Sequence, residues 1–86
     1  MASPIYFADE PAGRVAKVAG TGLGVWEVMR DYNAVAGDEA RLRDILPQIG
    51  PSQLTAGRRY YALHREEIDD LIADNEAVAA RLAAGR

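Results

Sequence analysis

The stretch "VAGTGLGVWEV" (residues 18–28) has three glycines at alternate positions and divides the chain into two parts of different periodicity. Before it stand two short β-prone runs, at residues 4–7 and 14–19, with a turn between them. From Val25 onwards, apolar residues recur at helical spacing. The sequence therefore predicts a mainly α fold with a short N-terminal β-strand pair.

The glycines themselves could form a phosphate-binding loop or only a turn. A dinucleotide-binding loop needs the pattern G-x-G-x-x-G between a strand and a helix of a parallel sheet. Gly20 and Gly22 have the first spacing, but Val25 occupies the third position and Gly24 comes one residue early. A chain of 86 residues is also too short for that fold, and the lysine of a P-loop is missing. We therefore interpret the glycines as the turn that lets a strand fold back into a helix.

Proline and glycine divide the remainder into helical segments. The spacing predicts a first helix over residues 25–35, ended by a glycine, and a short second helix over 38–46, capped by its first residue and ended by proline. A link at 48–50 leads to a proline suited to a helix start, and the pattern then runs over 51–84. Because one helix of that length is unusual, we expect a bend or break near His64.

Two helices joined by so short a link match the layout of a helix-turn-helix, in which residues 51–61 would be the recognition helix. Gln and Arg can read adenine and guanine edges, and Ser and Thr can bind phosphates. Any solvent-facing helix carries such residues too, so both interpretations stay open. The candidate DNA-binding residues are Ser52, Gln53, Thr55, Arg58 and Arg59.

The net charge of −3 is unevenly distributed. Residues 1–64 carry seven basic and seven acidic side chains, whereas residues 65–86 carry three basic and six acidic ones. The chain lacks the basic excess of a strong nonspecific nucleic-acid binder, so any DNA contact should be local and doubled by a second subunit. A homodimer is expected because an isolated strand pair is marginally stable, and the strands of a second subunit would cover its edges.

Composition also bears on localisation and on catalysis. The chain has no cysteine, no apolar run of membrane-spanning length and no signal-peptide pattern, so we expect a cytoplasmic protein without a membrane partner. His64 is the only histidine, and the acidic pairs are adjacent in sequence, so they diverge around a helix. We therefore expect no enzyme, catalytic residue, metal, cofactor or small-molecule substrate.

The C-terminal segment has the spacing of an interaction helix. Apolar residues, one histidine and one asparagine follow a 3–4 pattern close to a heptad seam: Tyr61, His64, Ile68, Leu71, Asn75, Val78 and Leu82. The first four either cover the core of this domain or belong to a partner interface. Beyond Asn75 little core is left to cover, so we expect Val78 and Leu82 to meet another chain.

Five short motifs occur in a distinctive order: Gly20-Thr21, Val25-Trp26, Leu46-Pro47, Tyr60-Tyr61 and Glu66-Glu67-Ile68-Asp69. Together, over roughly residues 14–77, the chain resembles the bacterial family catalogued as domain of unknown function 433. It departs from the family pattern at Gly22, where many members have arginine, at Arg58, where an apolar residue is usual, and at Arg65, where proline is frequent.

The resemblance implies a homeodomain-like helix-turn-helix and a role as an antitoxin of the VapB type, in a type II toxin-antitoxin system. Such a protein binds and inhibits a PIN-like ribonuclease toxin and binds operator DNA as a dimer to regulate transcription. From the resemblance together with the residue patterns above, we expect a division into N-terminal strands and glycine turn for dimerisation (1–24), a helix-turn-helix core (25–64) and an acidic C-terminal helix for partner binding (65–86). A stand-alone dimeric DNA-binding regulator is the alternative.

An inhibitory mechanism follows from that resemblance. PIN-like nucleases hold Mg²⁺ in a cluster of acids, and a guanidinium could occupy that cluster because it pairs bidentately with carboxylates. Arg81 and Arg86 are the candidates, although two solubilising arginines at a helix C-terminus would look the same. The candidate partner-binding residues are Ile68, Leu71, Asn75, Val78, Arg81, Leu82 and Arg86.

Overall fold

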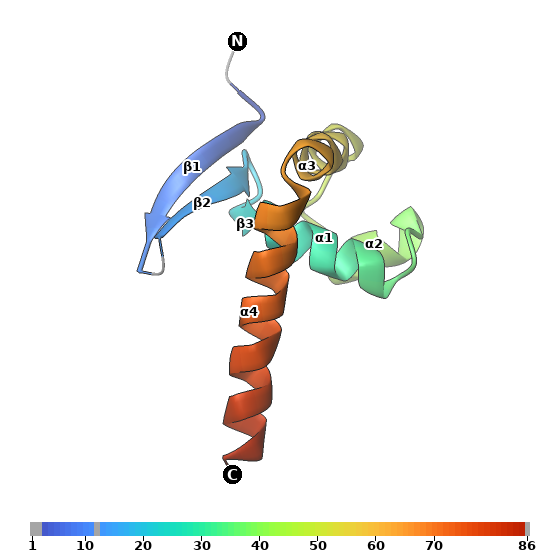
Figure 1. The fold of residues 1–86 in the computed structure, drawn as a ribbon. Helices are drawn as coiled ribbons and strands as arrows, with labels where there is room; N and C mark the ends of the chain where they lie inside the picture. Colours follow the sequence, from blue (N-terminus) through green and yellow to red (C-terminus); the bar gives the residue numbers. More distant parts are fainter. Residues whose placement is uncertain (1–2, 12, 86) are drawn as a thin grey trace.

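The computed structural model describes residues 3–11 and 13–85, which form a mainly helical domain with a small antiparallel sheet (Figure 1). In chain order, its elements are β1 (Ile5–Glu10), β2 (Gly13–Val18), β3 (Leu23–Gly24), α1 (Val25–Ala34), α2 (Glu39–Ile45), α3 (Pro51–Leu63) and α4 (Arg65–Ala84). The predicted strand pair and mainly α character are confirmed. The two-residue strand β3 is an addition that the sequence pattern did not indicate.

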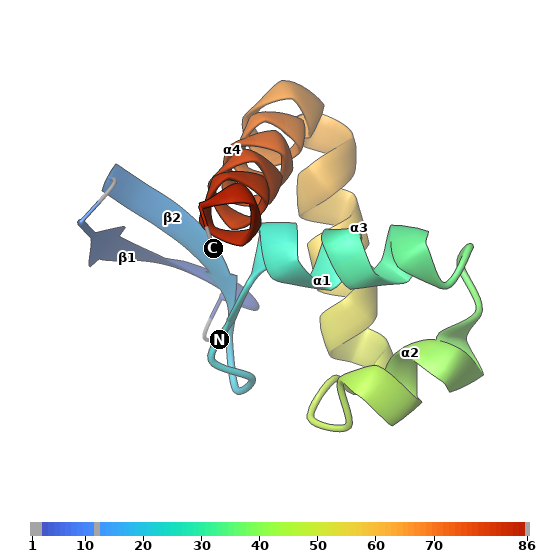
Figure 2. The same ribbon diagram turned by 90° about the horizontal axis from the view of Figure 1, so that it is seen from below.

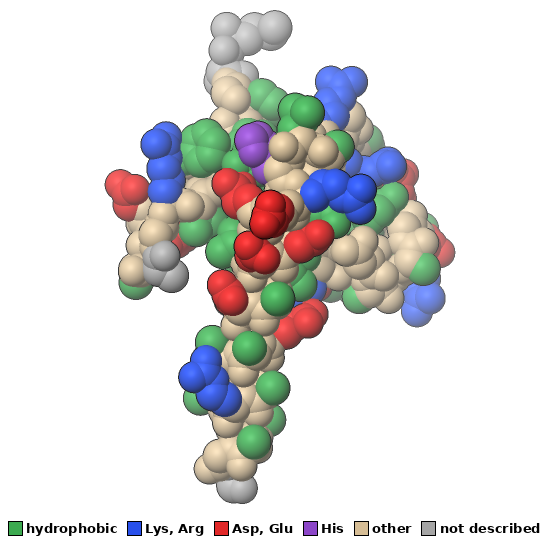
Figure 3. All heavy atoms as spheres, viewed as in Figure 1, with side chains coloured by type: hydrophobic (Ala, Val, Ile, Leu, Met, Phe, Trp, Pro, Cys, Tyr) green, Lys and Arg blue, Asp and Glu red, His purple; other side chains and the backbone are tan. Residues whose placement is uncertain are grey.

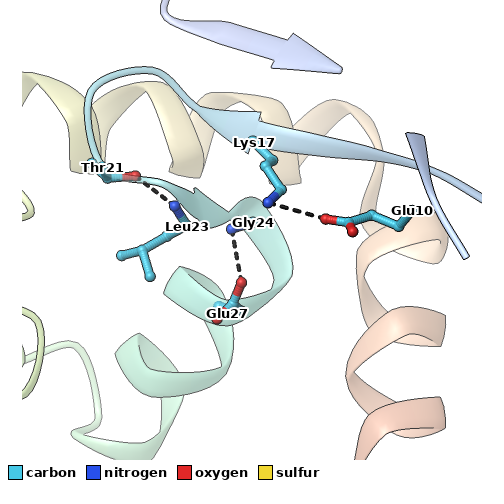
Figure 4. Close-up of polar contacts among 6 residues, drawn as sticks. All are labelled: Glu10, Lys17, Thr21, Leu23, Gly24 and Glu27. Carbon is cyan, nitrogen blue, oxygen red and sulfur yellow. Dashed lines mark hydrogen bonds and ion pairs between the residues drawn. The ribbon is translucent and has the colours of Figure 1, made fainter. Parts of the chain in front are cut away.

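The sheet has the order β1-β2-β3, and each pair is antiparallel. β1 continues to Glu10, beyond the predicted run, and an ion pair of 3.0 Å joins the Glu10 Oε1 to the Lys17 Nζ (Figure 4). The hydrogen bond to Glu10 raises the pKa of Lys17 above its ordinary value. Glu10 lies next to the turn between β1 and β2, whereas Lys17 lies opposite Tyr6 and next to Gly24, so the ion pair reaches diagonally along the β1–β2 hairpin.

The glycine stretch is the turn between β2 and β3. Gly20 and Gly22 have φ values of 82° and 73°, which side-chain-bearing residues rarely adopt. Between them, the Thr21 hydroxyl donates to the Val18 carbonyl (2.8 Å) and accepts from the Leu23 N–H (3.0 Å). The interpretation as a turn is confirmed: the hydroxyl replaces backbone partners while the chain reverses (Figure 4).

The starts of α1, α2 and α3 follow local signals in the sequence, whereas α4 begins after His64 without a side-chain cap. The Gly24 N–H donates to the Glu27 Oε1 (3.0 Å) at the start of α1 (Figure 4), and the Asp38 Oδ1 accepts from the Arg41 N–H (3.2 Å) at the start of α2. Pro51 is the first residue of α3, as expected. These contacts satisfy N–H groups that have no partner within a helix.

The expected break near His64 is confirmed. His64 has φ −136° and ψ 42°, outside the helical region, so α3 and α4 are separate helices. Its N–H still donates to the carbonyls of Tyr60 and Tyr61, which completes the last turn of α3. α4 therefore leaves α3 at an angle (Figure 1).

The hydrophobic core lies where β2, α1, α2, α3 and the first turns of α4 meet. α1 packs against each of the other three helices, so it is the central helix of the domain. The largest fully buried side chains are Leu42, Ile68, Val18, Val25 and Val28. Among the described residues, no charged or polar side chain is buried.

Only part of α4 belongs to this body. Its inner part (residues 65–72) includes a buried residue and two half-buried ones, whereas every residue of its outer part (73–84) is exposed. Asn75, near the start of the outer part, still borders a small hollow with residues of β1, β2 and α1. Beyond it, α4 projects away from the other elements (Figure 1), toward the viewer in Figure 2, and the molecule measures 45 × 29 × 20 Å. None of the helices in the described part of the chain is both long and apolar enough to span a membrane.

Candidate functional site

The exposed face of α3 carries four of the five residues predicted to bind DNA. Ser52, Thr55, Arg58 and Arg59 are exposed. The Thr55 hydroxyl donates to the Pro51 carbonyl one turn earlier (3.0 Å), and its oxygen can still accept. The structure therefore brings two hydroxyls and two guanidinium groups together on one helix face.

Gln53, the fifth of these residues, is instead hydrogen-bonded within the fold. Its Oε1 accepts from the Gly50 N–H (2.7 Å), and its Nε2 donates to the Ala19 carbonyl (3.1 Å). Both ends of the half-buried amide are thus occupied, so Gln53 is not free to read a base edge in this structure. A Gln at the third helical position is a known capping pattern, which is the signal that could have indicated this role.

A shallow groove of about 580 Å³ separates β1 from α3. Its lining is mainly apolar and includes Ile5, Ala56, Tyr60 and Leu63, the last of which is 81% exposed. Nothing in the sequence pattern indicated this groove, because it forms between residues that are about fifty positions apart.

The predicted seam of α4 divides into two sets. Ile68 is fully buried in the core of the chain itself, and Leu71 is half-buried against that core. Ile68 is thus a correction to the predicted partner-binding residues, since a partner cannot reach it while the domain keeps this fold. The interpretation as a cover of the domain's own core holds for Tyr61, Ile68 and Leu71, but not for His64, which is exposed.

The outer set of the seam is accessible. Val78 is 48% and Leu82 66% exposed, and with Arg81 they line an open hollow of about 340 Å³. Asn75 is exposed, and its Nδ2 donates to the Leu71 carbonyl of the same helix (2.8 Å). Arg86, the remaining predicted partner residue, lies outside the described residues.

Two tyrosines of α3 tie the inner part of α4 to the body. The Tyr60 hydroxyl donates to the Glu67 carboxylate (2.6 Å), and the Tyr61 hydroxyl donates to the Asp69 carboxylate (2.8 Å). Burial of its ring, followed by the hydrogen bond to Glu67, raises the pKa of Tyr60 to about 12. Acidic side chains gather on this part of α4 (Figure 3). Two of them, Glu67 and Asp69, are hydrogen-bonded to the tyrosines of α3.

His64 lies beside this junction. Its imidazole is exposed and stacks on the Tyr60 ring, with 4.2 Å between centroids. Within residues 3–11 and 13–85, no group of three or more His, Asp or Glu side chains is placed to hold a metal ion.

Comparisons of the chain with models of known protein families, with curated proteins and with solved structures found no match.

Proposed function

We propose that the chain is the antitoxin of a type II toxin-antitoxin pair and that the outer part of α4 binds its toxin. The observation that carries this proposal is the projection of that helix with Val78, Arg81 and Leu82 exposed. A helix without tertiary contacts is only marginally stable in water, so its apolar residues gain burial by docking in the groove of another protein.

Arg81 is the side chain best suited to inhibit a PIN-like ribonuclease. It lies in the last turn of α4, and the ion pairs of the described residues join other side chains. Its guanidinium could therefore enter the acidic cluster that holds Mg²⁺ in such an enzyme and pair bidentately with a carboxylate. The resemblance to the family named above supports this choice of partner.

The proposal includes a homodimer formed through the N-terminal strands. β1 is an edge strand, so one row of its backbone N–H and C=O groups has no strand partner within the sheet. Tyr6 and Phe7 on this strand are 43% and 46% exposed, which is high for large aromatic side chains. Pairing with a second copy would cover both features. The proposed assembly is cytoplasmic.

A stand-alone DNA-binding regulator is the second candidate function. The exposed face of α3 favours it, because Ser52, Thr55, Arg58 and Arg59 offer hydroxyls and guanidinium groups and no carboxylate. In this proposal, α2 and α3 are the two helices of a homeodomain-like helix-turn-helix, with α3 as the recognition helix. An antitoxin that represses its own operon would use the same face.

The test begins with a mild pull-down of the tagged chain from its host and identification of the bound proteins by mass spectrometry. We expect a ribonuclease at near-equal amount. Its activity and affinity are then measured with the intact chain, with a chain lacking residues 77–86 and with Arg81→Gln. The deletion should abolish inhibition without unfolding the domain, and Arg81→Gln should weaken binding about 30-fold, as expected of an interface hot spot.

Arg41→Gln is the matched control, because Arg41 is an exposed arginine of α2. It should inhibit as well as the intact chain. If the deleted chain still inhibits the ribonuclease, the proposed role of α4 is wrong. Recovery of DNA without a protein partner would favour the stand-alone regulator.

A further inference from the structure

We infer that Arg58 and Arg65 form a binding site for a phosphate group between α1, α3 and the start of α4. A hollow of about 350 Å³ lies there, lined by Met29, Tyr32, Asn33, Arg58, Tyr61 and Arg65 among others. Basic side chains stand beside the junction of α3 and α4 on this face of the molecule (Figure 3). The site is separate from the outer part of α4, so it does not depend on the proposed toxin binding.

Each guanidinium is held by an aromatic ring. The Arg58 guanidinium carbon lies 5.3 Å from the centroid of the Tyr32 ring, and that of Arg65 lies 5.6 Å from the Tyr61 ring. Contact with a ring face restricts a guanidinium while its N–H groups remain able to donate in its own plane. Two long, flexible side chains are thereby positioned before any ligand arrives, which lowers the entropy lost on binding.

The two positive charges have no carboxylate counterpart in the hollow. Of the residues that the structure describes, no Asp or Glu lines it, and the two ion pairs are Lys17–Glu10 and Arg30–Asp31. Asp69, one turn beyond Arg65, accepts from the Tyr61 hydroxyl and keeps its negative charge nearby, but it does not line the hollow or form an ion pair with either arginine. Like charges at the border of one hollow repel each other, and an anion between them would remove that repulsion.

The donor set favours phosphate over a single carboxylate. Two guanidinium forks and the Asn33 amide offer more N–H donors than the two oxygens of a carboxylate can accept, whereas a phosphate presents three or four oxygens around a tetrahedron. The hollow is also larger than one phosphate group. The group could therefore belong to inorganic phosphate, to a nucleotide or to a DNA backbone, and in the last case the site would extend the proposed DNA-binding face.

The test is an NMR titration of the ¹⁵N-labelled chain with inorganic phosphate, with thymidine 5′-monophosphate and with a short DNA duplex, each at constant ionic strength. We expect saturable shifts of the Asn33 side-chain amide and of the amides around Arg58 and Arg65. Arg58→Gln and Arg65→Gln should each weaken binding at least 10-fold, because each removes a charged fork. Arg65→Lys should retain part of the affinity, since it keeps the charge but loses the fork.

The three titrations also identify the molecule that carries the phosphate group. Equal affinity for phosphate and the nucleotide assigns the site to the phosphate group alone, stronger binding of the nucleotide assigns it to a nucleotide, and stronger binding of the duplex assigns it to DNA. Arg43→Gln, at an exposed arginine of α2, is the matched control and should bind like the intact chain. If chloride at the same ionic strength causes the same shifts, or if Arg65→Gln binds as tightly as the intact chain, the inference is overturned.

Discussion

The inner part of α4 (residues 65–72) and its outer part (73–84) are one continuous helix with one apolar spacing, yet they have different environments. Ile68 in the inner part is fully buried, whereas Val78 and Leu82 in the outer part are exposed. The comparison teaches that apolar spacing identifies which face of a helix is suited to packing. It does not show whether that face packs on the domain itself or on another chain. The body of the domain ends before the seam does.

The two parts also stay helical for different reasons. The inner part is held by core contacts and by hydrogen bonds from Tyr60 and Tyr61 to its carboxylates. The outer part is rich in alanine, the best helix former, and it extends a helix whose first turns are already fixed. Packing stabilises the first stretch, whereas propensity and propagation stabilise the second.

The largest expected effect that sharpens this comparison is that of Ile68→Ala. Removing a fully buried isoleucine should lower the free energy of unfolding by about 2–5 kcal/mol, because apolar contacts are lost and a cavity remains. Urea unfolding followed by circular dichroism measures it. Ile45→Ala is the matched control, since Ile45 is an isoleucine of α2 that is 52% exposed, and its cost should stay within about 0.5 kcal/mol. Equal costs at the two positions would mean that Ile68 is not the anchor of α4.

The next effect concerns the hydrogen bond between Tyr60 and the inner part of α4. At neutral pH, Tyr60→Phe should cost about 1 kcal/mol, because it removes the bond to Glu67 but keeps the ring. The pKa of Tyr60 is about 12 in the folded chain, against 10.0 for its ordinary value. This raised pKa contributes stability that is fully present below pH 10 and is lost as the pH rises through 12.

The measurement is the free energy of unfolding of the intact chain and of Tyr60→Phe at pH 9 and at pH 12. The difference between the two chains should be largest at pH 9 and should shrink at pH 12. Tyr6→Phe, at an exposed tyrosine of β1, controls for the loss of a phenol elsewhere. A difference that stays constant across this range would contradict a role of the Tyr60–Glu67 bond in holding α4.

Much of the local structure could be predicted from the sequence because its causes are local. Asp38 caps α2, Pro51 starts α3, and the glycine turn needs φ values that few other residues adopt. The break at His64 followed from the improbable length of a single helix. The two-residue strand β3 was missed because its signal is shorter than any useful window of periodicity.

The candidate sites were less predictable because they depend on contacts between distant residues. Gln53 looked like a DNA-reading side chain, but its amide bonds to Ala19, which lies 34 positions earlier. The seam of α4 was identified correctly as apolar, but only the fold determines that Ile68 faces this domain. The hollow beside Arg58 and Arg65 requires α1 to pack against the α3–α4 junction, which no spacing within one segment indicates.

The smallest expected effect is that of Leu82→Ala, and it is the most direct way to break the comparison. Leu82 is 66% exposed and alanine has the higher helix propensity, so the free energy of unfolding should change by no more than about 0.5 kcal/mol. Urea unfolding at two protein concentrations measures it. A loss above about 1 kcal/mol that grows with concentration would mean that a second copy covers the outer part of α4. That part would then be a subunit interface and would not be free to bind a toxin. The two parts of α4 would then differ only in what covers them, which is the core of the same chain for the inner part and a second copy for the outer part.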